Sequence, residues 1–183
     1  MRKKYTLEIE VPEGATCEFV DGTLKCKKGE KELEKEISIL GTTLSVEGNK
    51  ILIVCEKANK KNIAIIKSHK GHIKNLFAGL EENFVYELEV CNVHFPMTVK
   101  AEGDKITISN FLGEKIDRAA KIVSGVNVEI KGQKITVSGP DIEKTGQTAA
   151  NIENAARVPK KDKRVFQDGI FMTSKPGGAI RNL

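Results

Sequence analysis

The sequence predicts an α+β protein made of two tandem, duplicated domains, and three observations lead to this prediction. The stretch VEGNKILI at residues 46–53 closely resembles IKGQKITV at residues 130–137. Around both stretches polar and apolar residues alternate, which is typical of strands with one buried face. Each half then closes with apolar residues at steps of three and four, the period of an amphipathic helix. We therefore expect each domain to be a small, mostly antiparallel sheet assembly packed with one helix.

Each half opens with a strand, and hairpins follow it. The opening strands, YTLEIEV at residues 5–11 and FVYELEV at residues 84–90, resemble each other. Glycine adopts positive φ without steric cost, so glycine beside a polar residue between alternating runs indicates a tight turn. The pairs that fit this pattern are Asp21-Gly22, Gly48-Asn49, Gly103-Asp104 and Gly132-Gln133.

The spacing of apolar residues predicts the closing helix of each half. In the first half these residues are Ile63, Ile66, Ile73, Leu76, Phe77 and Leu80, and in the second half Ile142, Thr145, Ala149, Ile152 and Ala156. We expect Gly79 to end the first helix and Pro140 to occupy the first turn of the second, where no amide proton is needed. The predicted domains are residues 1–82 and 83–172, followed by a flexible extension at 173–183.

Basic charge is concentrated at the end of the chain. The formal net charge is +5, and residues 157–183 contain seven basic and two acidic residues. The first 156 residues are therefore neutral overall, and the last 27 carry the whole excess. Such a cluster is typical of a surface that binds a polyanion.

The composition indicates an ordinary water-soluble protein. Hydrophobic residues make up 39% and charged residues 30% of the chain. No apolar run approaches the roughly 18 residues of a membrane-spanning helix. The basic start, MRKK, is not followed by the apolar core of a signal peptide. We therefore expect a cytoplasmic protein without a membrane partner.

Residues suited to catalysis or metal binding are few. The cysteines are Cys17, Cys26, Cys55 and Cys91. None forms a CxxC pair, so we interpret them as buried thiols, with metal ligation or a redox role as the alternatives. His69 and His72 have no third ligand nearby in sequence, so His69 is interpreted as a packed core histidine. There is no GxSxG elbow and no phosphate-binding loop. We expect neither an enzyme nor a bound cofactor or metal.

The basic stretch RVPKKDKRVFQDGIF, residues 157–171, fits a nucleic-acid interface. Phe166, Ile170 and Phe171 are expected to anchor it, so that its basic side chains are held against a phosphate backbone. The preceding helix adds a stripe of amides, which suit RNA edges and 2′-hydroxyls. The predicted RNA-binding residues are Arg157, Lys160, Lys161, Lys163, Arg164, Gln167, Lys144, Gln147, Asn151 and Asn154. The alternatives are a frayed basic terminus and a merely solvated helix face.

The kind of nucleic acid follows from the aromatic content. Aromatic residues make up only 5% of the chain, with no Trp. Proteins that bind single strands stack bases on aromatic side chains, so recognition of a folded RNA by shape and backbone fits better. The other function that fits the basic segment is a free regulatory RNA- or DNA-binding module.

Several motifs of the second half occur in the order expected of a known family. They are HFPMTVK at 94–100, EGDKI at 102–106, NFLGEK at 110–115, GQTAANIE at 146–153 and RVFQDGI at 164–170. They closely resemble the archaeal and eukaryotic form of large-ribosomal-subunit protein six, called nine in eukaryotes. In the first half, SHKGHIKNL at 68–76 resembles the same family more weakly.

The resemblance implies a duplicated two-domain fold and a structural role in the large ribosomal subunit. It implies that the second domain and its basic tail make the main contacts with large-subunit (23S-type) ribosomal RNA. It also implies a place near the stalk base and the sarcin–ricin loop, among neighbouring ribosomal proteins and close to the translational GTPases. The residues after Met172 have no counterpart in the resemblance.

Overall fold

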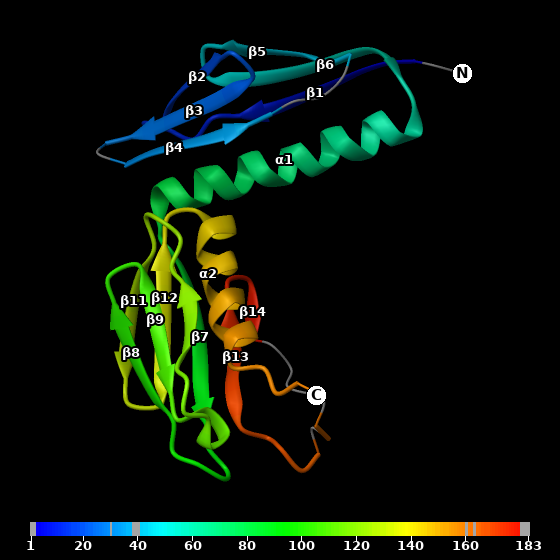
Figure 1. Ribbon diagram of the computed structural model, residues 1–183. Helices are drawn as coiled ribbons and strands as arrows, with labels where there is room; N and C mark the ends of the chain where they lie inside the picture. Colours follow the sequence, from blue (N-terminus) through cyan, green and yellow to red (C-terminus); the bar gives the residue numbers. More distant parts are fainter. Residues whose placement is uncertain (1–2, 30, 38–40, 160, 163, 180–183) are drawn as a thin grey trace. The chain divides into compact units, whose positions relative to one another are not determined.

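The computed structural model describes residues 3–29, 31–37, 41–159, 161–162 and 164–179. The chain separates into two compact units, Met1–Glu82 and Asn83–Leu183 (Figure 1). In the described residues each unit contains antiparallel sheets and one α-helix. The predicted α+β class is thereby confirmed.

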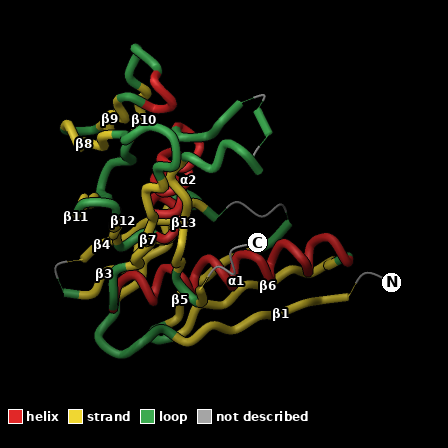
Figure 2. The backbone as a smooth tube through the Cα atoms, turned by 90° about the horizontal axis from the view of Figure 1, so that it is seen from below, coloured by secondary structure: helices red, strands yellow, loops and turns green. Residues whose placement is uncertain are grey.

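The first unit consists of two three-stranded antiparallel sheets and a long helix. Its elements are β1 (Lys3–Glu10), β2 (Thr16–Val20), β3 (Thr23–Lys28), β4 (Lys31–Glu36), β5 (Thr43–Glu47), β6 (Lys50–Ala58) and α1 (Lys60–Glu81). One sheet has the strand order β1-β6-β5 and the other β2-β3-β4. Figure 2 shows β1 and β6 side by side, with α1 next to them.

The second unit repeats this arrangement and adds a hairpin. Its elements are β7 (Phe84–Cys91), β8 (Thr98–Glu102), β9 (Lys105–Ser109), a 3-10 turn (Phe111–Gly113), β10 (Arg118–Lys121), β11 (Asn127–Lys131), β12 (Lys134–Gly139), α2 (Ile142–Ala155), β13 (Gly169–Lys175) and β14 (Gly178–Ala179). The order β7-β12-β11 repeats β1-β6-β5, and β8-β9-β10 repeats β2-β3-β4. Strand β13 pairs antiparallel with the other edge of β7.

The repeated hairpins turn at equivalent glycines. Gly48 has φ +60° and follows the last pair of the β5–β6 ladder, Glu47 with Lys50. Gly132 has φ +63° and follows the corresponding pair of β11–β12, Lys131 with Lys134. Glycine at the first loop position of a two-residue hairpin matches the right-handed twist of the strands. The expected equivalence of the two turns is confirmed.

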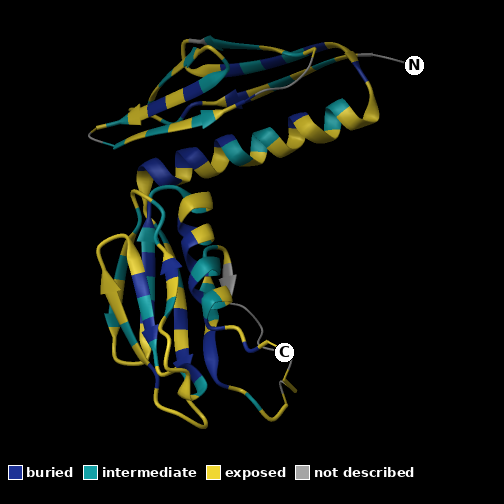
Figure 3. Ribbon diagram, viewed as in Figure 1, coloured by how far each residue is buried: buried dark blue, intermediate teal, exposed yellow. Residues whose placement is uncertain are grey.

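Each unit has its own hydrophobic core. Apolar side chains at alternate strand positions and on one face of the helix are buried (Figure 3). In the first core Ile51, Ile53 and Ile66 are fully buried, and in the second Ile135 and Ile152 are. Burial of each such side chain stabilises the fold by roughly 1.5–3 kcal/mol. The alternating pattern in the sequence therefore identified the faces that pack together.

The helix boundaries differ from the prediction at two residues. Gly79 lies buried inside α1, which continues to Glu81, so it does not end the helix. Pro140 precedes Asp141, the residue that caps α2, and lies outside the first turn. The start of α2 is set by the Asp141 cap, and α1 continues past Gly79 because glycine is compatible with a helix interior, although less favourable there than alanine.

The expected flexible extension also differs from the structure. Strand β13 continues to Lys175 and turns at Gly177, whose φ is +88°. Ser174 then pairs with Ala179 of β14. The edge of β7 thus supplies backbone partners up to Ser174, and the residues after it form a hairpin with β13. Residue Arg181, counted in the terminal charge, lies outside the described residues.

His69, in the first unit, is not a fully packed core residue. His69 is half-buried on α1, and its ring centroid lies 5.8 Å from that of His72. Burial and the neighbouring charges of His72 and Lys35 lower the pKa of His69. The ring therefore lies at the border of the core rather than inside it.

Candidate nucleic-acid interface

Helix α2 presents the predicted polar stripe on its outer face. Its N-terminal cap is Asp141, whose carboxylate accepts a hydrogen bond from the Glu143 backbone at 2.9 Å. Thr145, Ala149 and Ile152 are fully buried, so the opposite face points to solvent. The stripe consists of Lys144, Gln147 and Asn154, which are exposed, and Asn151, which is half-buried.

The amide of Asn151 has a structural role within this stripe. Its Nδ2 donates to the Lys121 carbonyl of β10 at 3.0 Å. Its Oδ1 accepts from Gln147 Nε2 at 2.8 Å. Asn151 thus connects the helix to the neighbouring sheet and orients Gln147. The remaining donors and acceptors for a ligand lie on Lys144, Gln147 and Asn154.

Arg118 fixes the end of α2 and the start of the basic segment, which we define as residues 157–164. Its Nε and Nη2 donate to the carboxylate of Glu114 at 2.7 and 2.6 Å. Its Nη1 donates to the carbonyls of Ala155 and Arg157 at 3.0 and 2.9 Å. Carbonyls at the end of a helix lack partners within the helix, so the guanidinium satisfies that of Ala155 and also holds the chain at Arg157. It also lies 4.2 Å from the centroid of the Phe111 ring.

Asp168, four residues after the basic segment, fixes the chain on the other side of it. The residue is 2% exposed. Its Oδ1 accepts hydrogen bonds from the backbone amides of Val93 and His94 at 2.8 and 2.9 Å. Its Oδ2 accepts one from His94 Nδ1 at 2.6 Å. These bonds join the segment to a loop more than 70 residues earlier in the chain.

The ionisation of Asp168 reflects this arrangement. Burial by itself would raise the pKa of the carboxyl group. Hydrogen bonds from the His94 backbone and ring and from the Val93 backbone outweigh burial and lower the pKa to about 2. Asp168 is therefore a buried carboxylate at neutral pH, and its charge is compensated by three donors.

The basic side chains between these two fixed ends point to solvent. Arg157, Lys161 and Arg164 are all exposed. Lys160 and Lys163, which belong to the predicted set, lie outside the described residues. The described part of the segment therefore presents three cations on a backbone that is held at both ends.

Contacts within the segment orient two of these cations. Arg164 donates to the carboxylate of Asp162 through Nε and Nη2, the latter at 2.8 Å. The ammonium of Lys161 lies 4.4 Å from the centroid of the Phe166 ring. Gln167 Nε2 donates to the Arg164 carbonyl at 3.2 Å. Asp162 thus offsets part of the positive charge, whereas Lys161 is held over an aromatic face.

The three predicted apolar anchors behave differently. Ile170 is 1% exposed and packs in the core of the second unit. Phe166 is half-buried and stacks on His94, with ring centroids 5.2 Å apart. Phe171 is 43% exposed, so the expectation that it anchors the segment is wrong. Consecutive strand residues point to opposite faces, and β13 turns Ile170 inward and Phe171 outward.

Exposed apolar side chains lie on the loops next to the basic segment. They are Val93, Phe95, Ile116 and Val165. Hydrogen bonds from residues 93 and 94 to Asp168 bring the first loop against the segment. The ring of Phe95 also lies beside Gly113, in the loop that carries Ile116. We name these four residues the apolar loop patch.

Sequence reasoning missed Arg118 and Asp168 as positioning residues. The carbonyls that Arg118 satisfies lie 37 and 39 residues away, and the His94 partner of Asp168 lies 74 residues away. One signal for Asp168 was available: it is the single acid in VFQDGIF, directly before a glycine and a strand-like stretch. Its partner His94 lies in the motif HFPMTVK, but spacing alone does not reveal the contact.

In the described part of the chain, no three His, Cys, Asp or Glu side chains come together as a metal site. Neither helix among the described residues has the length and apolar character needed to cross a bilayer.

The fold and this surface define a class of protein: a duplicated α+β protein whose second unit carries an exposed basic segment, a surface typical of proteins that bind a polyanion. Comparison with known proteins specifies the class further. The family model described as ribosomal protein L6 matches residues 95–169, which include α2 and the basic segment.

Three archaeal relatives that match nearly the whole chain are each named large ribosomal subunit protein uL6. That of Methanocella arvoryzae is 42% identical and covers 96% of this chain and 99% of the relative. That of Methanococcus vannielii is 39% identical, over 94% and 95% of the two chains. That of Haloarcula marismortui is 42% identical, over 93% and 96%. The chain belongs to the ribosomal protein L6 family, and it is therefore a ribosomal protein and not an enzyme.

Proposed function

We propose that this protein is a structural constituent of the large subunit of the cytoplasmic ribosome and that its second unit binds large-subunit ribosomal RNA. The contact surface consists of the basic segment, Gln167 and the exposed stripe of α2. Its position in the subunit is near the stalk base and the sarcin–ricin loop, close to where translational GTPases act. The observation that carries the proposal is the fixation of the basic segment at both ends, by Arg118 and by Asp168.

This fixation favours recognition of a folded RNA. A flexible basic tail loses conformational entropy when it binds, whereas a fixed backbone presents its cations in one arrangement. Arg157, Lys161 and Arg164 supply contacts to phosphates, which set register and orientation. Gln147 and Asn154 on α2 supply donors and acceptors for sugars and base edges. Shape and charge together would select one RNA fold.

The apolar loop patch supports a second contact, with neighbouring ribosomal proteins. Val93, Phe95, Ile116 and Val165 are between 47% and 82% exposed. Aliphatic side chains gain little from a phosphate backbone, but they gain free energy when a protein surface removes them from water. In this proposal the basic segment faces RNA, and the patch next to it faces protein.

The salt dependence of binding tests the RNA interaction. The test variant carries Arg157→Gln, Lys161→Gln and Arg164→Gln, and the probe is a transcript of the stalk-base and sarcin–ricin region. Each cation that no longer neutralises a phosphate flattens the slope of log affinity against log salt by about 0.7 to 0.9, so the triple variant should reduce the slope by roughly two to three. An unchanged slope would remove this segment from the RNA-binding surface.

The matched control neutralises three lysines of the first unit, Lys27, Lys28 and Lys31. Lys28 is already paired with Glu81 at 2.9 Å, and the notable charge excess lies in the other unit. We expect the control variant to keep the affinity and slope of the natural protein. If its affinity falls as much as that of the test variant, the RNA-binding surface extends over both units.

A free regulatory nucleic-acid-binding module is the alternative function, and co-sedimentation distinguishes the two. A ribosomal constituent remains with large subunits, at one copy per subunit, through high-speed sedimentation in moderate salt. A free module stays in the supernatant and binds a short oligonucleotide tightly by itself. The same fractions, analysed for the triple variant, report whether the basic segment is needed for assembly.

A further inference from the structure

Two of the four cysteines are direct cross-strand partners in the first unit. The register of β2 and β3 places Cys17 opposite Cys26. Directly opposed residues of an antiparallel pair have Cα atoms about 4.5 or 5.5 Å apart, within the range of about 4.4 to 6.8 Å found in disulfides. Both side chains lie on the inner face of the sheet, because Cys26 is fully buried and Cys17 is half-buried. The register therefore places the two cysteines where a disulfide can form.

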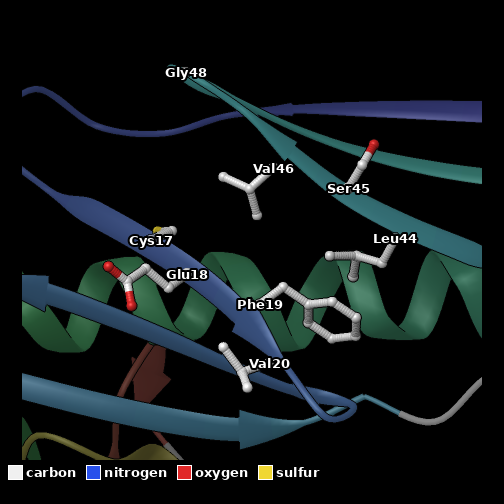
Figure 4. Close-up of a pocket in the computed structure, with 8 residues that line it drawn as sticks. All are labelled: Cys17, Glu18, Phe19, Val20, Leu44, Ser45, Val46 and Gly48. Atoms are coloured by element: carbon white, nitrogen blue, oxygen red, sulfur yellow. The ribbon is translucent and has the colours of Figure 1, made fainter.

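Cys17 is accessible from outside the core, whereas Cys26 is not. An open groove of about 580 Å³ runs between β2 and β5, and Cys17 lies among the residues that line it. Figure 4 shows Cys17 on one side of the groove and Val46 on the other. Phe19 extends the β2 side of the groove, and Leu44 extends the β5 side. A small molecule that enters the groove reaches the sulfur of Cys17 first.

The two thiols differ in acidity, and the difference favours Cys17 as the thiol that an oxidant attacks first. A hydrogen bond from Cys26 lowers the pKa of the Cys17 thiol, although burial acts against it. The same hydrogen bond, together with burial and the charge of the Cys17 thiolate, raises the pKa of Cys26. Cys17 is therefore the thiol that ionises first, and the thiolate is the reactive form.

We propose that Cys17 and Cys26 are a reversible redox site whose substrate is a peroxide. The Cys17 thiolate attacks the peroxide; the O–O bond breaks, and the leaving oxygen takes a proton as water or an alcohol. Cys17 is then a sulfenic acid, and the charge that held the proton on Cys26 is gone. The Cys26 sulfur attacks that of Cys17, forms the S–S bond and releases water. Two thiols are oxidised and one peroxide is reduced.

Mass spectrometry of the whole chain treated with hydrogen peroxide tests this site. We expect the loss of two hydrogens, a fall in alkylated cysteines from four to two, and a cross-link between residues 17 and 26. Dithiothreitol should restore all four labels. A cross-link elsewhere, or oxidation of Cys17 that leaves Cys26 free, would overturn the proposal. Since the cross-link is mapped in the natural sequence, this result does not depend on the folding of any variant.

Three substitutions separate the roles of the thiols. Cys17→Ser should abolish the loss of labels, and Cys26→Ser should stop the reaction at a sulfenic acid that dimedone traps. Cys91→Ser is the matched control. Cys91 is also half-buried, but burial and Glu89 raise its pKa, so its removal should leave the Cys17–Cys26 disulfide unchanged. If Cys17→Ser treated with hydrogen peroxide still lost two hydrogens, Cys17 would not be one of the two disulfide partners.

Discussion

The substitution Asp168→Asn tests how the basic segment is attached to the second unit. Asparagine has the shape of a protonated aspartic acid, so the variant reports what the negative charge contributes. The pKa of Asp168 is lowered from 3.8 to about 2. At 1.36 kcal/mol for each pKa unit, the charged form is favoured in the folded protein by roughly 2 kcal/mol. We expect the variant to lose about this much stability at pH 7.

The sign of the pH dependence follows from the lowered pKa. A carboxyl group whose pKa is lower in the folded state stabilises the fold fully above its unfolded pKa, here 3.8. The contribution decreases as the pH falls towards 2 and is roughly half its full value at pH 3. The difference between the natural protein and the variant should therefore shrink by about half between pH 7 and pH 3.

Amide hydrogen exchange at Val93 and His94 is the most direct assay, because both backbone amides donate to Asp168. Their protection should fall in Asp168→Asn, while the strands of the first unit stay protected. Asp162→Asn is the matched control, since Asp162 is exposed and its side chain contacts Arg164 two residues away. A stability difference that is the same at pH 3 and pH 7, or equal protection in both variants, would refute the assigned role of Asp168.

Five further substitutions, in three sets, have distinct expected outcomes. Arg118→Met should destabilise the second unit by about 1 to 3 kcal/mol in denaturant unfolding, because the carbonyls that it satisfies at the end of α2 lose a charged donor; unchanged stability would contradict this. Gly132→Ala and Gly48→Ala should each cost about 1 to 2 kcal/mol, since alanine is strained at φ near +60°, and unequal costs would indicate turns that are not equivalent. Ile170→Ala should cost about 2 to 5 kcal/mol by leaving a cavity in the core, whereas Phe171→Ala should change the melting temperature little; the reverse order would restore Phe171 as the anchor.

The pattern of the sequence was enough to predict the duplication and most of the local structure. Alternation, turn glycines and helical spacing depend on neighbours within a few residues, and these signals identified the hairpins at Gly48 and Gly132 and both helices. The α+β class follows from the same signals. The concentration of basic residues after α2 is also a property of the sequence alone, since charge can be counted without a structure. The binding role of those residues stays a prediction.

The tertiary structure decided the features that join distant parts of the chain. Strands β4 and β10 were not expected, because charged edge strands such as KELEKE lack a strong apolar alternation. Strand β13 forms because β7 has an edge that can pair with it, which no local pattern in residues 169–175 specifies. The bond between Asp168 and His94 likewise depends on how the fold brings two loops together. A sequence pattern reports which face of a segment avoids water, whereas the partner of a backbone edge or a buried carboxylate is fixed only when the chain has folded.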